Sequence, residues 1–199
     1  MKTQFSIIVV SLFFYCSLTY AQWVQTSLTS SRVNTILVSN ANLFAGTHSN
    51  GIFISYGNLV HNRITSSMVL SLAVSGTNLF AGTNGGGIYI SSNNGLNWSA
   101  VNNGLTNQYI HVLGVSGANL FAGSEGGLIY ISTNNGSSWS GINVGSAVSY
   151  FYTFAFSGIN IFAGALGGGV FLSTNNGLNW NAINTGLTDT DVLSLAVKD

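Results

Sequence analysis

Acidic side chains are the first candidates for chemistry in this sequence of 199 residues. After residue 21 the acids are Glu125, Asp189, Asp191 and Asp199. A retaining or inverting glycosidase places two carboxylates on opposite sides of the bond that it cleaves. Glu125 lies in a predicted turn, and Asp189 and Asp191 lie together in a predicted loop. We interpret these acids as solvated turn residues; a catalytic pair assembled across the fold is the alternative.

Metal and cofactor sites find little support in the residue types. His48, His61 and His111 share no ligand-type spacing, and the one cysteine, Cys16, lies close to the N-terminus. A zinc site built from Cys and His is therefore not predicted. Two glycine runs, at 85–87 and 167–169, lack the following helix and nearby lysine of a phosphate-binding loop. We interpret both runs as hairpin turns and expect no cofactor and no metal.

The low charge of the chain argues against nucleic acid as a partner. Only 4% of the residues are charged and the formal net charge is zero, whereas ordinary soluble domains carry roughly 25% charged residues. After residue 21 the basic side chains are Arg32, Arg63 and Lys198. Binding to nucleic-acid phosphates requires clustered Lys and Arg. The chain can still fold, because 46% of its residues are hydrophobic.

The N-terminus has the pattern of a secretory signal peptide at 1–21. Lys2 supplies a positive start, 5–18 is apolar, and 19–21 ends in Ala21 as a cleavage site. The apolar run is shorter than the ~20 residues needed to span a bilayer. A lipoprotein signal through Cys16 is disfavoured because the bulky Tyr15 precedes it. We predict a secreted or extracytoplasmic mature chain that begins at Gln22 and has no stable membrane insertion.

A segment of 21 residues recurs and organises the chain. It runs over 78–98, 119–139 and 160–180, so that Trp98, Trp139 and Trp180 lie 41 residues apart. An earlier, degenerate copy begins at Asn42, lacks the tryptophan and precedes the next copy by 36 residues. A fixed period of this length is typical of stacked structural units.

Within each copy, apolar and polar residues alternate as in β-strands. In the second copy we predict strands at 70–74, 79–83, 88–92 and 98–102, separated by Gly, Asn and Ser residues that suit tight turns. Such a unit cannot bury both faces alone, and stacking around an axis gives a β-propeller of four-stranded blades. A parallel β-helix is the alternative. The predicted all-β chain has an outer strand of a closing blade at 22–32, blades at 33–67, 68–108, 109–149 and 150–190, and the first strand of a further blade at 191–199. Because the next repeat would continue past Asp199, we expect an incomplete ring.

One aromatic run departs from the repeat. Tyr150, Phe151 and Tyr152 stand where the previous repeat has Tyr-Ile-His at 109–111. Aromatic rings at a propeller face can stack on a sugar ring or on a protein partner. These three residues are therefore candidate partner-binding residues. Extra packing between blades is the alternative, and the pattern favours it.

The turn before each tryptophan carries the most specific motif. It reads SSNNGLNW at 91–98, STNNGSSW at 132–139 and STNNGLNW at 173–180. These turns resemble the Asp-box (BNR) hairpin, Ser-x-Asp-x-Gly-x-x-Trp, with Asn in place of Asp. Asn can still bridge backbone amides within a turn. The motif residues are Ser91, Asn93, Gly95, Trp98, Ser132, Asn134, Gly136, Trp139, Ser173, Asn175, Gly177 and Trp180.

The resemblance implies a fold more firmly than an activity. Similar hairpins occur in sialidases, sortilin-type receptors, certain glucan hydrolases and the photosystem II assembly factor, where they lie away from the catalytic face. The motif residues are therefore expected to be structural. A sialidase-like site would need three arginines around a carboxylate, and this chain has only Arg32 and Arg63.

Two functions agree with these observations. We predict a secreted, non-enzymatic propeller that acts as a binding or scaffold module for an unknown protein or glycan partner. The alternative is a fragment of a larger propeller glycoside hydrolase, sialidase-like, or of a sensor whose active parts lie beyond residue 199.

Overall fold

A computed structural model of the chain describes residues 32–40, 42–56, 59–62, 68–145 and 148–198. The predicted signal peptide at 1–21 lies outside these residues, as does the predicted outer strand at 22–32 apart from residue 32. All regular structure in the described residues is β-strand. No helix among them has the length and apolar character needed to cross a membrane.

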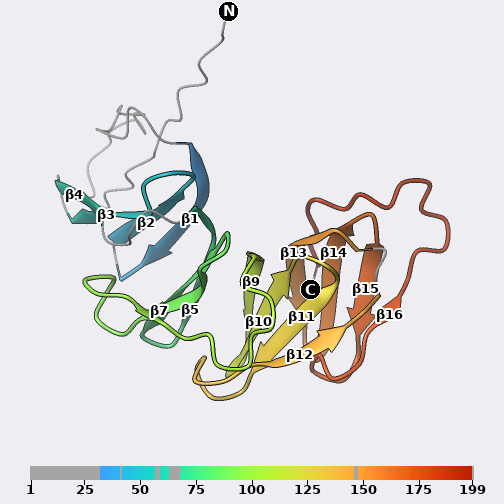
Figure 1. The fold of residues 1–199 in the computed structure, drawn as a ribbon. Helices are drawn as coiled ribbons and strands as arrows, with labels where there is room; N and C mark the ends of the chain where they lie inside the picture. Colours follow the sequence, from blue (N-terminus) through green and yellow to red (C-terminus); the bar gives the residue numbers. More distant parts are fainter. Residues whose placement is uncertain (1–31, 41, 57–58, 63–67, 146–147, 199) are drawn as a thin grey trace, which may run out of the picture.

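In the described residues, sixteen strands form four antiparallel sheets, and each sheet pairs four consecutive strands in chain order. The sheets follow one another along an open arc, from β1–β4 in blue to β13–β16 in red (Figure 1). Their strands are β1 (Val33–Ser39), β2 (Asn42–Thr47), β3 (Ile52–Tyr56) and β4 (Leu59–Asn62); β5 (Val69–Ser75), β6 (Asn78–Thr83), β7 (Gly87–Ser91) and β8 (Ser99–Ala100); β9 (Ile110–Ser116), β10 (Asn119–Ser124), β11 (Leu128–Ser132) and β12 (Ser140–Asn143); β13 (Tyr150–Ser157), β14 (Asn160–Leu166), β15 (Gly169–Ser173) and β16 (Asn181–Ala182).

The turn between β7 and β8 explains why its residues recur. The Ser91 hydroxyl donates to Asn93 Oδ1 (3.0 Å) and accepts from the Gly95 amide (2.8 Å). Asn93 Oδ1 also accepts from the Asn97 amide at 2.9 Å. Asn94 and Gly95 have φ values of 55° and 80°, a left-handed conformation that Asn and Gly tolerate. The same contacts recur in the turns at 132–138 and 173–179.

The tryptophan after this turn makes one of two contacts. The indole N–H groups of Trp98 and Trp180 donate to the glycine carbonyl of their own turn, at 3.1 and 3.0 Å. Trp139 donates instead to the carbonyl of Val101, just after the last strand of the preceding sheet, at 2.9 Å. Trp139 is only 4% exposed. The motif copy at 132–139 therefore also joins its own sheet to the one before it.

Each of these turns packs against the preceding sheet. A Cβ atom placed on Gly95 would lie 2.7 Å from Cε1 of Phe44, a residue of β2. Phe44 is 1% exposed, so the ring cannot turn aside without disturbing the core, and only glycine fits. The turn thus closes a hairpin and holds two sheets together. Equivalent contacts join Gly136 to Phe80 and Gly177 to Phe121, with corresponding distances of 2.9 and 2.6 Å.

The first strands of successive sheets are neighbours. β5 contacts both β1 and β9, and β9 contacts β13, and the Leu113 amide of β9 donates to Ser71 Oγ of β5 at 2.9 Å. The glycine of each second strand leaves room for the first strand of the next sheet. A Cβ on that glycine would lie 2.5–2.8 Å from a side-chain atom of that strand in the pairs Gly46–Val69, Gly82–Ile110 and Gly123–Phe151.

The predicted strands at 70–74, 79–83 and 88–92 correspond to β5, β6 and β7. The fourth strand is shorter than predicted, because β8 covers only Ser99–Ala100 rather than 98–102.

The strand predicted at 191–199 is not formed among the described residues, since 183–198 contain no strand. The Val192 amide donates to the Ala165 carbonyl at 2.9 Å. In the four sheets, each first strand is paired along its length with a second strand. No second strand follows Val192 in the described part of the chain.

Candidate binding site

A β-bulge occurs at the start of every first strand. The register with the second strand skips one residue in each case. A bulge bends its strand and re-aims a side chain, and bulges are over-represented next to functional sites. We call these four skipped residues the bulge row: Asn34, Leu70, His111 and Tyr152.

Side chains of the bulge row reach from one sheet to the next. Asn34 Nδ2 donates to the carbonyl of Val69, in the neighbouring first strand, at 2.9 Å. The ring centroids of His111 and Tyr152 lie 6.3 Å apart, although the two residues belong to successive sheets. The row therefore crosses the first strands of successive sheets rather than following one strand.

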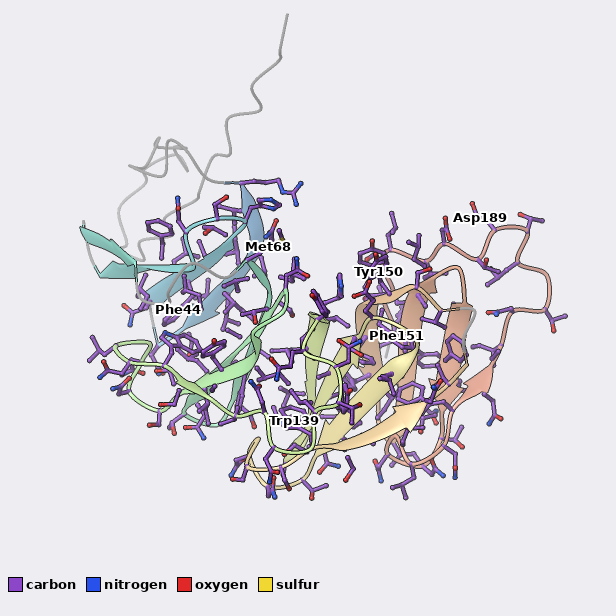
Figure 2. The ribbon with its side chains drawn as sticks, viewed as in Figure 1. Phe44, Met68, Trp139, Tyr150, Phe151 and Asp189 are labelled. Carbon is purple, nitrogen blue, oxygen red and sulfur yellow. The ribbon has the colours of Figure 1, made fainter. Side chains whose placement is uncertain are left out.

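Three rings gather at the boundary of the last two sheets. The His111 ring lies 4.6 Å from the Tyr150 ring, and the Tyr150 and Tyr152 rings lie 6.2 Å apart. Tyr152 is 40% exposed, and His111 and Tyr150 are half-buried. Figure 2 shows Tyr150 on the side of the molecule opposite Trp139. We call His111, Tyr150 and Tyr152 the aromatic cluster; it offers rings to solvent on the side away from that tryptophan.

Phe151 does not belong to this cluster. It is fully buried and packs edge-on against Phe171, with ring centroids 6.0 Å apart. Successive side chains of a strand point to opposite faces, so Phe151 enters the core between the sheets while its two neighbours remain at the surface. The predicted aromatic run is thus divided: Phe151 packs between sheets, whereas Tyr150 and Tyr152 remain partly exposed.

His111 brings an unused polar atom to the cluster. Its Nε2 atom is buried and has no hydrogen-bond partner among the described residues. Burial lowers the pKa of His111 below its ordinary value of 6.5, and the nearby Glu125 carboxylate opposes this in part. The imidazole is therefore mainly neutral at pH 7. A neutral imidazole offers one donor and one acceptor, and of these two groups the one at Nε2 lies unused below the surface.

The loop beside His111 is held by backbone contacts. The amide of Glu125 donates to the Tyr109 carbonyl at 3.2 Å, and Asn107 Nδ2 donates to the Glu125 carbonyl at 3.1 Å. The hydroxyl of the buried Tyr130 accepts from the Asn107 amide at 2.8 Å. These bonds fix Glu125 near the histidine, and sequence reasoning did not identify Tyr130 or Asn107 as its supports.

The other described carboxylates hold a loop. Asp189 Oδ1 accepts from the Asp191 amide, and Asp191 Oδ1 accepts from the Gly167 amide, both at 2.9 Å. Backbone capping of this kind is a structural use of a carboxylate. Figure 2 places Asp189 at the outer end of its loop. Asp199, the fourth acid considered, lies outside the described residues.

The remaining sequence candidates also take part in local structure. His48 Nδ1 lies 3.2 Å from Arg32 Nη2. The glycine run at 85–87 lies in the hairpin turn between β6 and β7, and the amides of Gly85 and Gly87 both donate to the Gln108 carbonyl, at 3.1 and 2.9 Å. Arg63 and the side chain of His61 lie outside the described residues.

Comparisons with known proteins give matches among solved structures. No protein-family model and no curated protein matches the chain. An ancestral GH74 enzyme is 21% identical, with a TM-score of 0.66, over 76% of this chain and 24% of its own. YCF48 bound to D1 peptide is 17% identical, with a TM-score of 0.60, over 87% of this chain and 59% of its own. The extracellular domain of a putative one-component system from B. thetaiotaomicron is 15% identical, with a TM-score of 0.64, over 79% of this chain and 22% of its own.

These neighbours are β-propellers, and with the four antiparallel sheets they confirm the predicted fold class. The described sheets are blades of a propeller whose ring is not closed. This chain spans less than two thirds of the length of each of the three proteins. Identities this low bear on the fold alone.

Proposed function

We propose that this chain is a secreted, non-enzymatic β-propeller module that binds a glycan or protein partner through the aromatic cluster. The observation that carries the proposal is the group of His111, Tyr150 and Tyr152, where two tyrosine rings accompany a buried imidazole nitrogen that has no partner among the described residues. The 40% exposed ring of Tyr152 can stack on an apolar face of a ligand. The His111 ring supports this surface from below, because it packs against Tyr150 with ring centroids 4.6 Å apart.

The chemistry of the surroundings supports binding rather than catalysis. Among the described acids, Asp189 and Asp191 cap backbone amides, which leaves Glu125 as the carboxylate near the cluster. Glycoside hydrolysis by the common mechanisms uses two carboxylates. The low charge of the whole chain favours a neutral ligand, such as an uncharged oligosaccharide, over a phosphate or a polyanion.

Two finer assignments form part of the same proposal. The turns at 91–98, 132–139 and 173–180 are an Asn variant of the Asp-box hairpin, supported by the serine and asparagine contacts within them. The N-terminal 21 residues direct the chain out of the cytoplasm, supported by their signal-like pattern.

A second candidate is a portion of a larger propeller protein, an enzyme or a sensor. The coverage of the neighbours favours it, because the chain matches 24% of an ancestral GH74 enzyme and 22% of the extracellular domain of a putative one-component system. In that case the aromatic cluster contributes to binding while the chemistry or the signalling belongs to other parts.

A glycan array tests the proposal together with two variants. Neutral oligosaccharides are expected to bind the wild-type chain and to bind Tyr152→Ala much more weakly. Leu178→Ala is the matched control, since Leu178 is 66% exposed in the third motif turn, outside the cluster. Equal binding by all three chains would contradict the assignment of the site. Release of cleaved sugar by the wild-type chain would contradict a non-enzymatic function.

A further inference from the structure

The last sheet has an apolar face that the other sheets keep covered. Phe162 of β14 and Val170 of β15 are half-buried. One repeat earlier, Phe121 and Ile129 occupy the same positions and are fully buried. Two repeats earlier the same is true of Phe80 and Ile88. The β13–β16 sheet therefore exposes a surface that is a sheet-to-sheet interface everywhere else in the described chain.

The covered copies of this surface show what fits on it. Phe121 is covered by the motif turn of the next sheet, where a Cβ on Gly177 would lie 2.6 Å from Cε1 of the ring. Phe80 receives Gly136 in the same way. Close packing of this kind needs a glycine in the turn, because any larger residue would meet the ring. The partner that fits Phe162 is a blade with a Ser-x-Asn-x-Gly turn.

Residues 188–198 already follow the path of the next first strand. A Cβ on Gly164 would lie 2.8 Å from Cγ1 of Val192, just as one on Gly82 would lie 2.8 Å from Cγ2 of Ile110. The Gly169 amide donates to the Thr190 carbonyl at 2.8 Å, and the Gly87 amide donates to the Gln108 carbonyl at 2.9 Å in the same relation. Thus the chain at Thr190 and Val192 makes the same contacts with the β13–β16 sheet as the chain at Gln108 and Ile110 makes with the β5–β8 sheet.

We propose that the open face of the β13–β16 sheet, centred on Phe162 and Val170, is the docking surface for a further blade of the same repeat. This blade is contiguous with residues 192–197, which form its first strand, and its motif turn places a glycine on Phe162. The first strand becomes regular when a second strand pairs with it, which accounts for its irregular form among the described residues. The proposal is independent of the aromatic cluster and of any ligand.

The test is a chain extended by one repeat. A copy of residues 118–158 is placed directly after Asp199. This keeps the 41-residue period, because the copied residue 118 then lies two full repeats after the original one. Hydroxyl-radical labelling with mass spectrometry reports on Phe162, whose own peptide is unchanged by the extension, and Phe80 is the buried reference. The labelling of Phe162 is expected to fall to that of Phe80, and the melting temperature is expected to rise by several degrees.

The matched control carries Gly136→Val in the added copy alone. This side chain would meet the Phe162 ring, so the control is expected to leave Phe162 labelled as in the unextended chain. The proposal is overturned if both extensions protect Phe162 equally, or if the wild-type extension leaves it labelled. It is also overturned if the unextended chain is a dimer with Phe162 already protected, because a second copy then covers the face. Light scattering and labelling of the unextended chain distinguish that outcome.

Discussion

The glycine of the motif turn offers a sharp test of how the blades are joined. Gly136 has a φ of 80°, and a Cβ there would lie 2.9 Å from Cε1 of Phe80. Gly126 has a φ of 76° but has no atom within 4 Å of the corresponding Cβ position. Alanine at either site incurs about 1–2 kcal/mol of left-handed backbone strain. At Gly136 the collision with the ring adds about 1–3 kcal/mol of overpacking.

We therefore expect Gly136→Ala to lower the free energy of unfolding by about 2–5 kcal/mol and Gly126→Ala by about 1–2 kcal/mol. Urea unfolding measures both values, because the free energy falls linearly with denaturant concentration. Replacing Phe80 by Leu in the Gly136→Ala background makes room for the new methyl group. The double variant should then be more stable than the sum of the two single losses predicts, by at least about 0.5 kcal/mol.

Two results would refute this reasoning. The first is that Gly136→Ala is at least as stable as Gly126→Ala, which would mean that the turn does not press on the Phe80 ring. The second is that the losses in the free energy of unfolding at Gly136 and Phe80 are additive in the double variant, which would mean that the two residues do not interact energetically.

Three further predictions concern the motif serine, the aromatic run at 150–152 and His111. Ser132→Ala removes the hydroxyl that bonds the Gly136 amide at 2.9 Å and should lower the free energy of unfolding by about 1–3 kcal/mol; an unchanged urea midpoint would contradict the assigned contact. Phe151→Ala should cost about 3–5 kcal/mol as a buried aromatic, whereas Tyr152→Ala should leave the urea midpoint nearly unchanged, and equal losses would contradict the division of the aromatic run. Burial lowers the pKa of His111 in the folded chain below 6.5. Between the folded-state pKa and 6.5, the unfolded chain therefore binds more protons than the folded chain does. The free energy of unfolding should decrease as the pH falls through 6.5, and this decrease should end below the folded-state pKa. Urea titrations at pH 7.5 and 5 should show a smaller pH effect in His111→Gln, and an equal effect would refute this origin.

Much of the fold follows from the repeat itself. The 41-residue period and the strand alternation predict four-stranded units, and the Asn and Gly residues mark turns that indeed use left-handed backbone at Asn94 and Gly95. The contact of Gly95 with Phe44 could not be predicted in the same way, because the two residues belong to different repeats and their pairing depends on how blades stack. The strand expected at 191–199 is not formed among the described residues, because strand alternation indicates where a strand can form and not whether a partner strand is present.

The candidate site was predictable only in part. The departure of 150–152 from the repeat directed attention to β13, but it did not separate the buried Phe151 from the partly exposed tyrosines. The sequence did not indicate His111 as a binding residue, since the bulge that brings it to Tyr150 has no motif of its own. A usable signal existed in the alignment of the repeats, where His111 and Tyr152 occupy the same position one period apart.

The measurement that tests the proposed function most directly is a calorimetric titration with the oligosaccharide that binds most strongly on the array. The account predicts that Tyr152→Ala weakens binding by at least about tenfold, or about 1.4 kcal/mol, and that Leu178→Ala binds as the wild type does. It also predicts that the sugar is recovered intact after the titration. Unchanged affinity in Tyr152→Ala, or recovery of a cleaved sugar, would contradict a binding module built on the aromatic cluster.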